Sequence, residues 1–444
     1  MADHVGIAVT PRRYDPSGIA GQIARNYGAA FERLGLTPIY VDLATADEAA
    51  FGRLRQPDVK LLFSHGGWLF NDQGPLGSRG PALAREADKP TIVLIADPPF
   101  SWWLPPIFAA LPRRAMPFFI DPSFAEGIGH WIPSGAHASY VPCGLTLDGH
   151  GPVPTADKDI PALFIGSLQD PNKLYEELKQ RPDLLHLIRP IIDAVIDDPF
   201  KPLLHAANEP LAESGRTLNF DKPLARSVLH KIDQFVREHR RARMVNRLLH
   251  HDVHIVAHGV ARLPAGARAT LLPPVHFLGM LNLLRRAKAI CVCQPHFPGA
   301  LNERIVFAMQ ARCLVIATPN TRTPQLFEHG RHLFLTAPDL SDVDRWVEAA
   351  RDDSVADPMR EAALRQVTER HTPEGNIRHM LRRLGQAGLM DPGVTVPDGP
   401  ELTMPPLDAG AKLGAPTDSA LHAEAGRSVD DGAGCGPAPD AGRA

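Results

Sequence analysis

The segment around residues 289–312 contains the side chains best suited to bind a phosphate group. Residues 289–293 are apolar and predict a buried strand, and Asn302-Glu303-Arg304 opens a stretch with helical spacing. A helix N-terminus offers unpaired amide hydrogens and partial positive charge, and Arg304 adds a guanidinium on the first turn. This combination suits a diphosphate. A plainer interpretation is that Asn302 caps the helix and Glu303 complements its dipole.

Gly166 and Ser167 form a second candidate phosphate contact. They end the apolar run 162–167, which predicts the first buried strand of a second domain. A glycine turn lets main-chain amides approach phosphate oxygens, and the serine hydroxyl adds a hydrogen bond. An ordinary turn between a strand and a helix has the same composition, so the spacing leaves both interpretations open.

Three side chains in the first half of the chain are candidate bases. His65, Asp97 and Asp121 each follow a predicted strand. A histidine or carboxylate at such a position could act as a general base and deprotonate a substrate hydroxyl. Each also has a structural explanation, because turn histidines are common and Asp121 could cap the turn that follows it.

No metal site and no cofactor are predicted from the remaining candidates. Asp342-Val-Asp344 matches a pattern that can hold a divalent metal, but it opens a helical stretch, which favours a capping role. Cys291 and Cys293 alternate within the predicted strand at residues 289–293, so both thiols would lie on one face as small apolar groups.

Short apolar runs alternate with helical patterns along most of the chain, which predicts parallel sheets with helices on both faces. Residues 148–160 predict a linker between an N-terminal domain, 1–147, and a C-terminal domain, 161–385. Residues 386–444 contain no Phe, Trp or Tyr and predict a disordered tail. The predicted strands are 5–10, 37–41, 59–63, 91–96, 118–120 and 138–141, then 162–167, 254–257, 289–293, 314–317 and 333–336, with a long helical region over 174–250.

Composition excludes several classes of protein. The 444 residues include 47 Lys and Arg against 50 Asp and Glu, a formal net charge of −3, and no long basic block occurs. We therefore expect no nucleic-acid partner. The 5 cysteines are scattered, which fits a reducing compartment, and no apolar run is long enough to predict a transmembrane segment. We expect a cytoplasmic protein and leave peripheral membrane contact open. No Walker loop and no Gly-x-Gly-x-x-Gly turn supports a simple NTPase or dehydrogenase.

Residues 302–312 read Asn-Glu-Arg-Ile-Val-Phe-Ala-Met-Gln-Ala-Arg. This segment resembles the "His-Glu-Arg-Val-x-x-Ala-Met-x-x-Gly" helix of GT-B type glycosyltransferases, in particular the bacterial group that includes spore-maturation glycosyltransferases. Asn302 stands where that group has His, and Arg312 where it has Gly. The Glu-x7-Glu pair of many retaining GT-B enzymes is absent, because Gly299 and Phe307 occupy its positions. Further matches, in the same order as in the group, are Asp97-Pro-Pro-Phe100, Asp121, Val141-Pro-Cys-Gly144, Phe164-Ile-Gly-Ser167, Arg240-Arg241, Phe327-Glu-His-Gly330 and His371-Thr372.

The resemblance implies a GT-B architecture, in which two Rossmann-like, doubly wound α/β domains face a cleft, and a hexosyltransferase-type enzyme. It implies transfer to a hydroxyl of a glycan, lipid, protein or small molecule, with a cell-envelope glycan as the expected setting. Because no metal site is predicted and the helix start with Arg304 can neutralise a diphosphate, we expect the transfer to be metal-independent. A transfer with inversion of configuration needs a base such as His65, Asp97 or Asp121, whereas a transfer with retention does not. The nucleotide-sugar donor is then a substrate and not a cofactor. A catalytically silent GT-B relative that binds a glycan or a protein partner, and a sugar-nucleotide epimerase, stay open as alternatives. The implied donor-binding residues are Gly166, Ser167, Asn302, Glu303 and Arg304.

Overall fold

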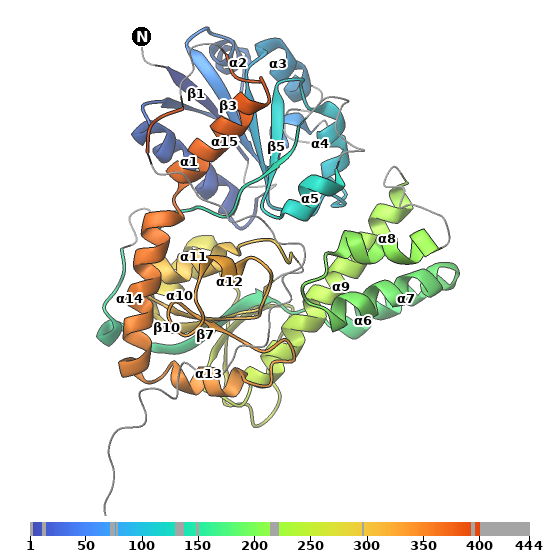
Figure 1. The fold of residues 1–444 in the computed structure, drawn as a ribbon, viewed down its shortest axis with the longest axis vertical. Helices are drawn as coiled ribbons and strands as arrows, with labels where there is room; N and C mark the ends of the chain where they lie inside the picture. Colours follow the sequence, from blue (N-terminus) through green and yellow to red (C-terminus); the bar gives the residue numbers. More distant parts are fainter. Residues whose placement is uncertain are drawn as a thin grey trace, which may run out of the picture. The chain divides into compact units, whose positions relative to one another are not determined.

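The first sheet of the protein has six parallel strands in the order β2-β1-β3-β4-β5-β6 (Figure 1). The structure is a computed structural model, and it describes residues 3–10, 15–71, 76, 79–128, 137–147, 151–213, 222–294, 297–391 and 396–399. All six strands overlap the predicted apolar runs, but β5 begins at Ala115, ahead of the predicted run 118–120. They are β1 (His4–Val9), β2 (Thr37–Asp42), β3 (Val59–His65), β4 (Thr91–Ile95), β5 (Ala115–Phe119) and β6 (Ser139–Tyr140).

Both faces of the first sheet are buried, as expected for parallel strands joined by crossover helices. Successive side chains of a strand point to opposite faces. On β4, Ile92 and Leu94 pack with α1 (Ile19–Arg33), whereas Val93 and Ile95 pack with α4 (Leu104–Ala110). The other helices of this half are α2 (Glu48–Leu54), the 3-10 turn η1 (Trp68–Phe70), α3 (Arg79–Ala87) and α5 (Pro122–Gly127).

The second sheet is also six-stranded and parallel, in the order β12-β11-β10-β7-β8-β9. One of its strands, β9, is absent from the sequence-based prediction, because it has only three residues and lies at the sheet edge. Cys291 of β10 and Cys293, which directly follows this strand, pack in the same buried apolar cluster. The strands are β7 (Ile160–Ser167), β8 (His254–His258), β9 (Thr270–Leu272), β10 (Ala287–Val292), β11 (Leu314–Ala317) and β12 (Phe334–Leu335).

The long helical region predicted over residues 174–250 consists of four helices. Proline stands at the first position of three of them, at Pro171, Pro182 and Pro223, where its missing N–H leaves no hydrogen bond unmade. The last helix, α9, contacts both β7 and the preceding helices (Figure 1). It therefore joins this helical group to the second sheet. The helices are α6 (Pro171–Lys179), α7 (Pro182–Asp197), α8 (Leu203–Glu213) and α9 (Pro223–Leu248).

Helix α15 (Pro373–Gln386) follows the second sheet in the chain but packs against α1 of the first half (Figure 1). Asn376 Nδ2 donates a hydrogen bond to the Tyr27 hydroxyl at 3.0 Å, and Arg33 forms an ion pair with Glu374. Five helices of the described chain precede α15 in the C-terminal half after α9. They are α10 (Phe277–Arg286), α11 (Glu303–Gln310), α12 (Thr323–Leu326), α13 (Val343–Ala349) and α14 (Asp353–Arg370).

Part of the segment predicted to be a disordered tail, 386–444, is described. Arg114 Nη2, in the first half, donates a hydrogen bond to the Leu389 carbonyl at 3.0 Å and pairs with Asp391. The side chain of Val396 packs against the main apolar cluster. Residues 392–395 and 400–444 of the predicted tail lie outside the described residues.

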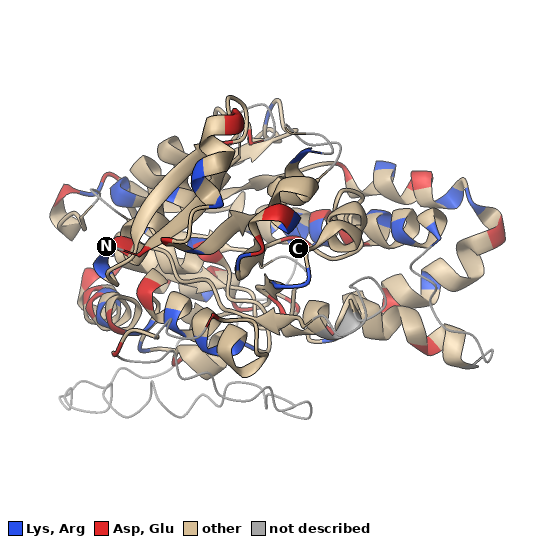
Figure 2. Cartoon of the chain, turned by 90° about the horizontal axis from the view of Figure 1, so that it is seen from above, with Lys and Arg blue, Asp and Glu red and all other residues tan. Residues whose placement is uncertain are grey.

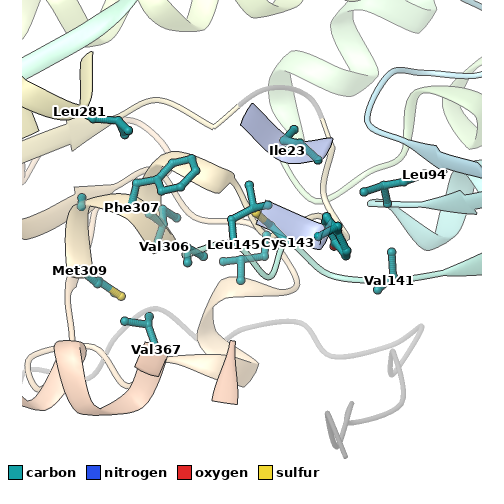
Figure 3. Close-up of a cluster of buried hydrophobic side chains, with 14 of the residues drawn as sticks. Ile23, Leu94, Val141, Cys143, Leu145, Leu281, Val306, Phe307, Met309 and Val367 are labelled. Atoms are coloured by element: carbon teal, nitrogen blue, oxygen red, sulfur yellow. The ribbon is translucent and has the colours of Figure 1, made fainter. Parts of the chain in front are cut away.

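The largest apolar cluster includes side chains from both halves of the chain. Figure 3 shows Ile23 from α1 and Leu94 from β4 in this cluster, together with Leu145, Leu281 from α10 and Phe307 from α11. Both sheets belong to one compact unit of the chain. The contacts between the two halves therefore lie within this single unit.

Candidate active site

A cavity of about 300 Å³ is lined by residues at the carboxyl ends of strands in both sheets. His65 ends β3, Asp97 follows β4, and Gln294 follows β10. The order of the first sheet reverses between β1 and β3, and ligands of open α/β sheets bind at such switch points, outside the carboxyl ends of the strands. Of the sequence-predicted site residues, His65, Asp97, Asn302, Glu303 and Arg304 line this cavity.

The first turn of α11 contributes one wall of the cavity. The Asn302 side chain caps the helix, because its Oδ1 accepts a hydrogen bond from the N–H of Arg304 at 2.9 Å. Within the described part of the chain, the guanidinium of Arg304 has no hydrogen bond or ion pair, and its buried Nε is unpartnered. Burial lowers the pKa of Arg304, and the nearby Glu303 carboxylate opposes this shift. A partly buried guanidinium without an ion-pair partner is well suited to bind an anion.

Helix α9 places two further arginines, Arg237 and Arg241, on the cavity wall. Arg237 Nη2 lies 2.7 Å from Asp233 Oδ2, and Asp233 is buried. Burial raises the pKa of Asp233, and the charge of Arg237 partly offsets this effect. The cavity therefore has three guanidinium groups, one of which, that of Arg304, lacks a carboxylate partner among the described residues.

Gly166 and Ser167 lie behind Arg241 and are absent from the cavity lining. The Ser167 hydroxyl donates to Glu238 Oε1 at 2.7 Å and accepts a hydrogen bond from Arg241. Arg241 Nη1 lies 2.8 Å from Glu238 Oε1. A Cβ added at Gly166 would lie 3.8 Å from Arg241 Cδ. Ser167 thus helps to hold Arg241 in place, and Gly166 lies beside the Arg241 side chain.

His65 and Asp97 form the titratable groups on the first-sheet side of the cavity. Both ring nitrogens of His65 are buried and unpartnered within the described residues, and burial lowers the pKa of the ring to about 4. Asp97 is exposed to the cavity, and the surrounding protein removes enough water from its carboxylate to raise its pKa to about 6. Arg237 lowers the pKa of Asp97, whereas Asp233 and Glu303 raise it.

Asp121, the third candidate base, does not line the cavity. Its Oδ1 accepts hydrogen bonds from the Ser123 N–H at 2.9 Å and the Ser123 hydroxyl at 2.6 Å, and its Oδ2 accepts from the Gly299 N–H at 2.9 Å. The carboxylate is fully buried. It caps α5 and ties the loop before α11 to the first sheet.

Among the described residues, no group of three or more His, Cys, Asp or Glu side chains could hold a metal ion. Asp342 and Asp344 have other partners: Asp342 Oδ2 accepts from the Trp346 indole N–H at 2.8 Å, and Asp344 pairs with His251 at 2.7 Å. Basic and acidic residues are interspersed over the helices in Figure 2. No helix of the described chain is both long and apolar enough to cross a membrane.

Two parallel sheets covered by helices, with a cavity at the carboxyl ends of strands from both, define a GT-B fold. The fold is similar to that of T4 phage BGT, whose structure was determined in complex with its substrate UDP-glucose, at a TM-score of 0.50 and 8% identity, over 88% of this chain and 99% of that chain. Sucrose-phosphate synthase from Thermosynechococcus elongatus aligns with a TM-score of 0.45 and 12% identity, over 87% of this chain and 100% of that one. HepE from Anabaena, in complex with UDP and glucose, aligns with a TM-score of 0.42 and 11% identity, over 87% and 100%.

Residues 226–382 match the family model described as "Glycosyl transferase-like". This segment includes both cavity arginines of α9, the first turn of α11 and most of α15. Residues 226–382 are therefore similar to glycosyl transferases, and the chain as a whole has the GT-B fold. No curated protein matches it in sequence.

The sequence alone identifies only part of this wall. From the sequence, Arg241 is identified only through the family resemblance, and Arg237 and Glu238 are not identified. A signal is present, since Arg237 and Arg241 are four residues apart and share one face of a long helix. The sequence alone does not show whether that helix face lines a cavity or is exposed to solvent.

Proposed function

We propose that the protein transfers a sugar from a nucleoside-diphosphate-sugar donor to an acceptor hydroxyl. The observation that carries this proposal is the unpaired guanidinium of Arg304 at the start of α11, in the same cavity as Asp97. T4 phage BGT, which has the same fold, has UDP-glucose as its substrate. The cavity thus offers a site for an anionic leaving group and a carboxylate that can accept a proton.

The three cavity arginines would stabilise the leaving diphosphate. Negative charge grows on the diphosphate as the glycosidic bond breaks, and fixed cations in an enclosed site stabilise that charge. Arg304 would contact the diphosphate directly, at the positive end of the α11 helix dipole. Arg241, held by Glu238 and Ser167, would supply a second positioned charge. These charges would make the reaction metal-independent, with no cofactor beyond the donor as substrate.

Asp97 would act as the base in a transfer with inversion. Its carboxylate has no hydrogen-bond partner among the described residues, and its pKa of about 6 leaves it deprotonated at neutral pH yet basic enough to take a proton. His65 is the second candidate base. With a pKa of about 4 it is neutral at physiological pH but a weaker proton acceptor. We assign the base to Asp97 for this reason.

The cytoplasm is the proposed compartment. The described cysteines, Cys143, Cys291, Cys293 and Cys313, are all free and buried. Free thiols in this number suit a reducing environment.

A thermal-shift panel with UDP-, GDP-, ADP- and dTDP-sugars tests the donor assignment. A ligand that binds only the folded state stabilises it, so the cognate donor should raise the melting temperature in a concentration-dependent manner. Release of free nucleotide in the presence of acceptor should follow, and millimolar EDTA should leave it largely intact. An enzyme that interconverts sugar nucleotides without releasing nucleotide would instead be an epimerase.

A catalytically silent GT-B relative is the second candidate, favoured by Asn302, which stands at the position of a histidine in the resembling group and is engaged in capping α11. Donor-dependent stabilisation without turnover would support it. Arg312, the other departure, has a φ of 53° at the far end of α11 and forms an ion pair with Glu361, outside the cavity lining. That substitution therefore gives no reason to expect loss of activity.

A further inference from the structure

The cavity wall on the first-sheet side is almost entirely apolar. Ile19 and Ile23 of α1, Leu94 of β4 and Ile120 after β5 line it, and Cys143 and Leu145 continue the same surface. Figure 3 shows Ile23, Leu94, Cys143 and Leu145 gathered in one region. His65 and Asp97 supply the imidazole and the carboxylate on this side of the cavity, where Tyr27 adds a buried hydroxyl that already accepts a hydrogen bond from Asn376.

The polar groups on the opposite side are committed to other partners or to the donor. Gln294 Nε2 donates to the Thr318 carbonyl and to Thr323 Oγ1, and its Oε1 accepts from Asn320. Asn302 Oδ1 accepts from the backbone N–H of Arg304. Apart from the Glu303 carboxylate and the Asn302 amide nitrogen, few side-chain polar atoms on this side therefore remain for the hydroxyls of an acceptor.

A saccharide acceptor would fit this wall poorly. Each sugar hydroxyl that is buried without a hydrogen-bond partner loses its hydration without compensation. A molecule with one reactive hydroxyl and an apolar body avoids this penalty, because its body gains from burial against Ile and Leu side chains. A volume of about 300 Å³ is at the small end of the range for small-molecule sites.

We propose that the acceptor is an alcohol or phenol whose hydroxyl is carried by an apolar body, which packs against Ile19, Ile23 and Ile120. This proposal rests on the proposed function. The acceptor hydroxyl gives its proton to the Asp97 carboxylate, and its oxygen forms a bond to the anomeric carbon of the donor. The bond between that carbon and the diphosphate oxygen breaks, and the nucleoside diphosphate leaves with the electron pair.

A second cavity, of about 280 Å³, has a more polar lining than the apolar wall described above. It lies at the carboxyl ends of β1 and β2, and its lining includes Asp42, Gln22, Arg25 and His276. This lining suits hydroxyl groups better than the apolar wall does. If the acceptor were a saccharide that extends into this cavity, Arg25→Ala would raise its KM. We expect no effect of Arg25→Ala on transfer to an apolar acceptor.

The test uses the donor selected by thermal shift and four acceptors. 4-Methylumbelliferone and geraniol are the apolar probes, and maltose and N-acetylglucosamine are the saccharides. We expect kcat/KM at least about tenfold higher for an apolar probe, a difference that one or two buried methylene groups can supply. Nucleotide release and the mass of the glycoside product report the transfer.

Ile120→Asn tests the wall itself. Ile120 is only partly buried, so the substitution should leave the fold intact. It should raise KM for the apolar acceptor about tenfold, because it replaces an apolar contact with an amide. The variant should keep the melting-temperature increase caused by the donor. Leu278→Asn is the matched control, since Leu278 is an exposed apolar residue of the second cavity. We expect Leu278→Asn to change neither the KM for the apolar acceptor nor the rise in melting temperature caused by the donor.

Transfer to maltose with equal or higher kcat/KM, or an unchanged KM in Ile120→Asn, would overturn the acceptor class while leaving the donor assignment intact. If no nucleotide sugar stabilises the protein and no nucleotide is released with any acceptor, the proposed function fails and this inference fails with it.

Discussion

Asp121 and Gly299 are 178 positions apart in the chain, and the Asp121 carboxylate accepts a hydrogen bond from the Gly299 N–H at 2.9 Å. Asp121 ends the connection from β5, and Gly299 lies in the loop that leads to Asn302 and Arg304. A Cβ at Gly299 would lie only 2.7 Å from Pro122 Cδ, so the loop approaches closely there. This contact fixes the loop that precedes the proposed phosphate site.

Asp121→Ala should destabilise the protein by about 2 kcal/mol or more, because it leaves buried donors of Ser123 and Gly299 without an acceptor. Urea unfolding measures this loss. Asp121→Asn retains one acceptor oxygen and should lose less. The rate per folded molecule should fall by less than tenfold. A loss of hundredfold or more at unchanged stability would instead make Asp121 a base.

The pH dependence of kcat/KM distinguishes the two remaining candidate bases. A base must be deprotonated, so the rate rises with pH through the pKa of the essential group. If Asp97 is the base, kcat/KM should rise through an apparent pKa of about 6 and level off above it. If His65 is the base, the rate should already be maximal at pH 6 and should fall only towards pH 4. Asp97→Asn should remove the step near pH 6 and lower the rate by at least about hundredfold.

Arg304→Ala should lower turnover at least about tenfold, because a charge-assisted bidentate contact contributes roughly 1.5 to 3 kcal/mol and 1.4 kcal/mol is one decade in rate. The melting temperature should change little, since the guanidinium has no partner among the described residues. Arg304→Lys should restore only part of the rate, because an ammonium lacks the fork geometry. A normal rate per folded molecule, with a lower melting temperature, would make the residue structural.

Two truncations separate the described C-terminal contacts from the residues beyond them. A chain that ends at residue 399 should keep its melting temperature. The residues that it lacks, 400–444, contain no aromatic side chain that could pack into a core. A chain that ends at residue 385 loses the contacts of Arg114 with Leu389 and Asp391 and the packing of Val396. We expect it to be less stable by about 1 to 2 kcal/mol, from lost hydrogen bonds and apolar burial. Differential scanning calorimetry of both forms decides this.

The sequence predicts the strands of both sheets well because each buried strand of a parallel sheet is a short apolar run. It does not predict β9, because Thr270–Leu272 is too short to form a pattern. It also does not predict the position of α15, whose apolar spacing identifies a buried face without identifying the partner. Only the fold shows that this partner is α1.

Part of the candidate site can also be predicted from the order of strands and helices along the chain. His65, Asp97 and Arg304 follow strands or begin a helix, so their positions relative to a sheet can be derived from order along the chain. Asp121 has the same sequence signature as Asp97, but its carboxylate is saturated by Ser123 and Gly299. Whether a carboxylate has free lone pairs depends on residues far away in the sequence, and no local pattern reports it.

The position of α15 has a consequence for the synthesis of the chain. When residues 1–147 have left the ribosome, every strand of the first sheet has been made, but the helix that covers α1 has not. Tyr27 and Phe31 of α1 share a buried cluster with Ile377 and Met380 of α15. This face therefore stays uncovered throughout translation of the second sheet, and a nascent chain stalled in that interval exposes an apolar surface to chaperones and to other nascent chains.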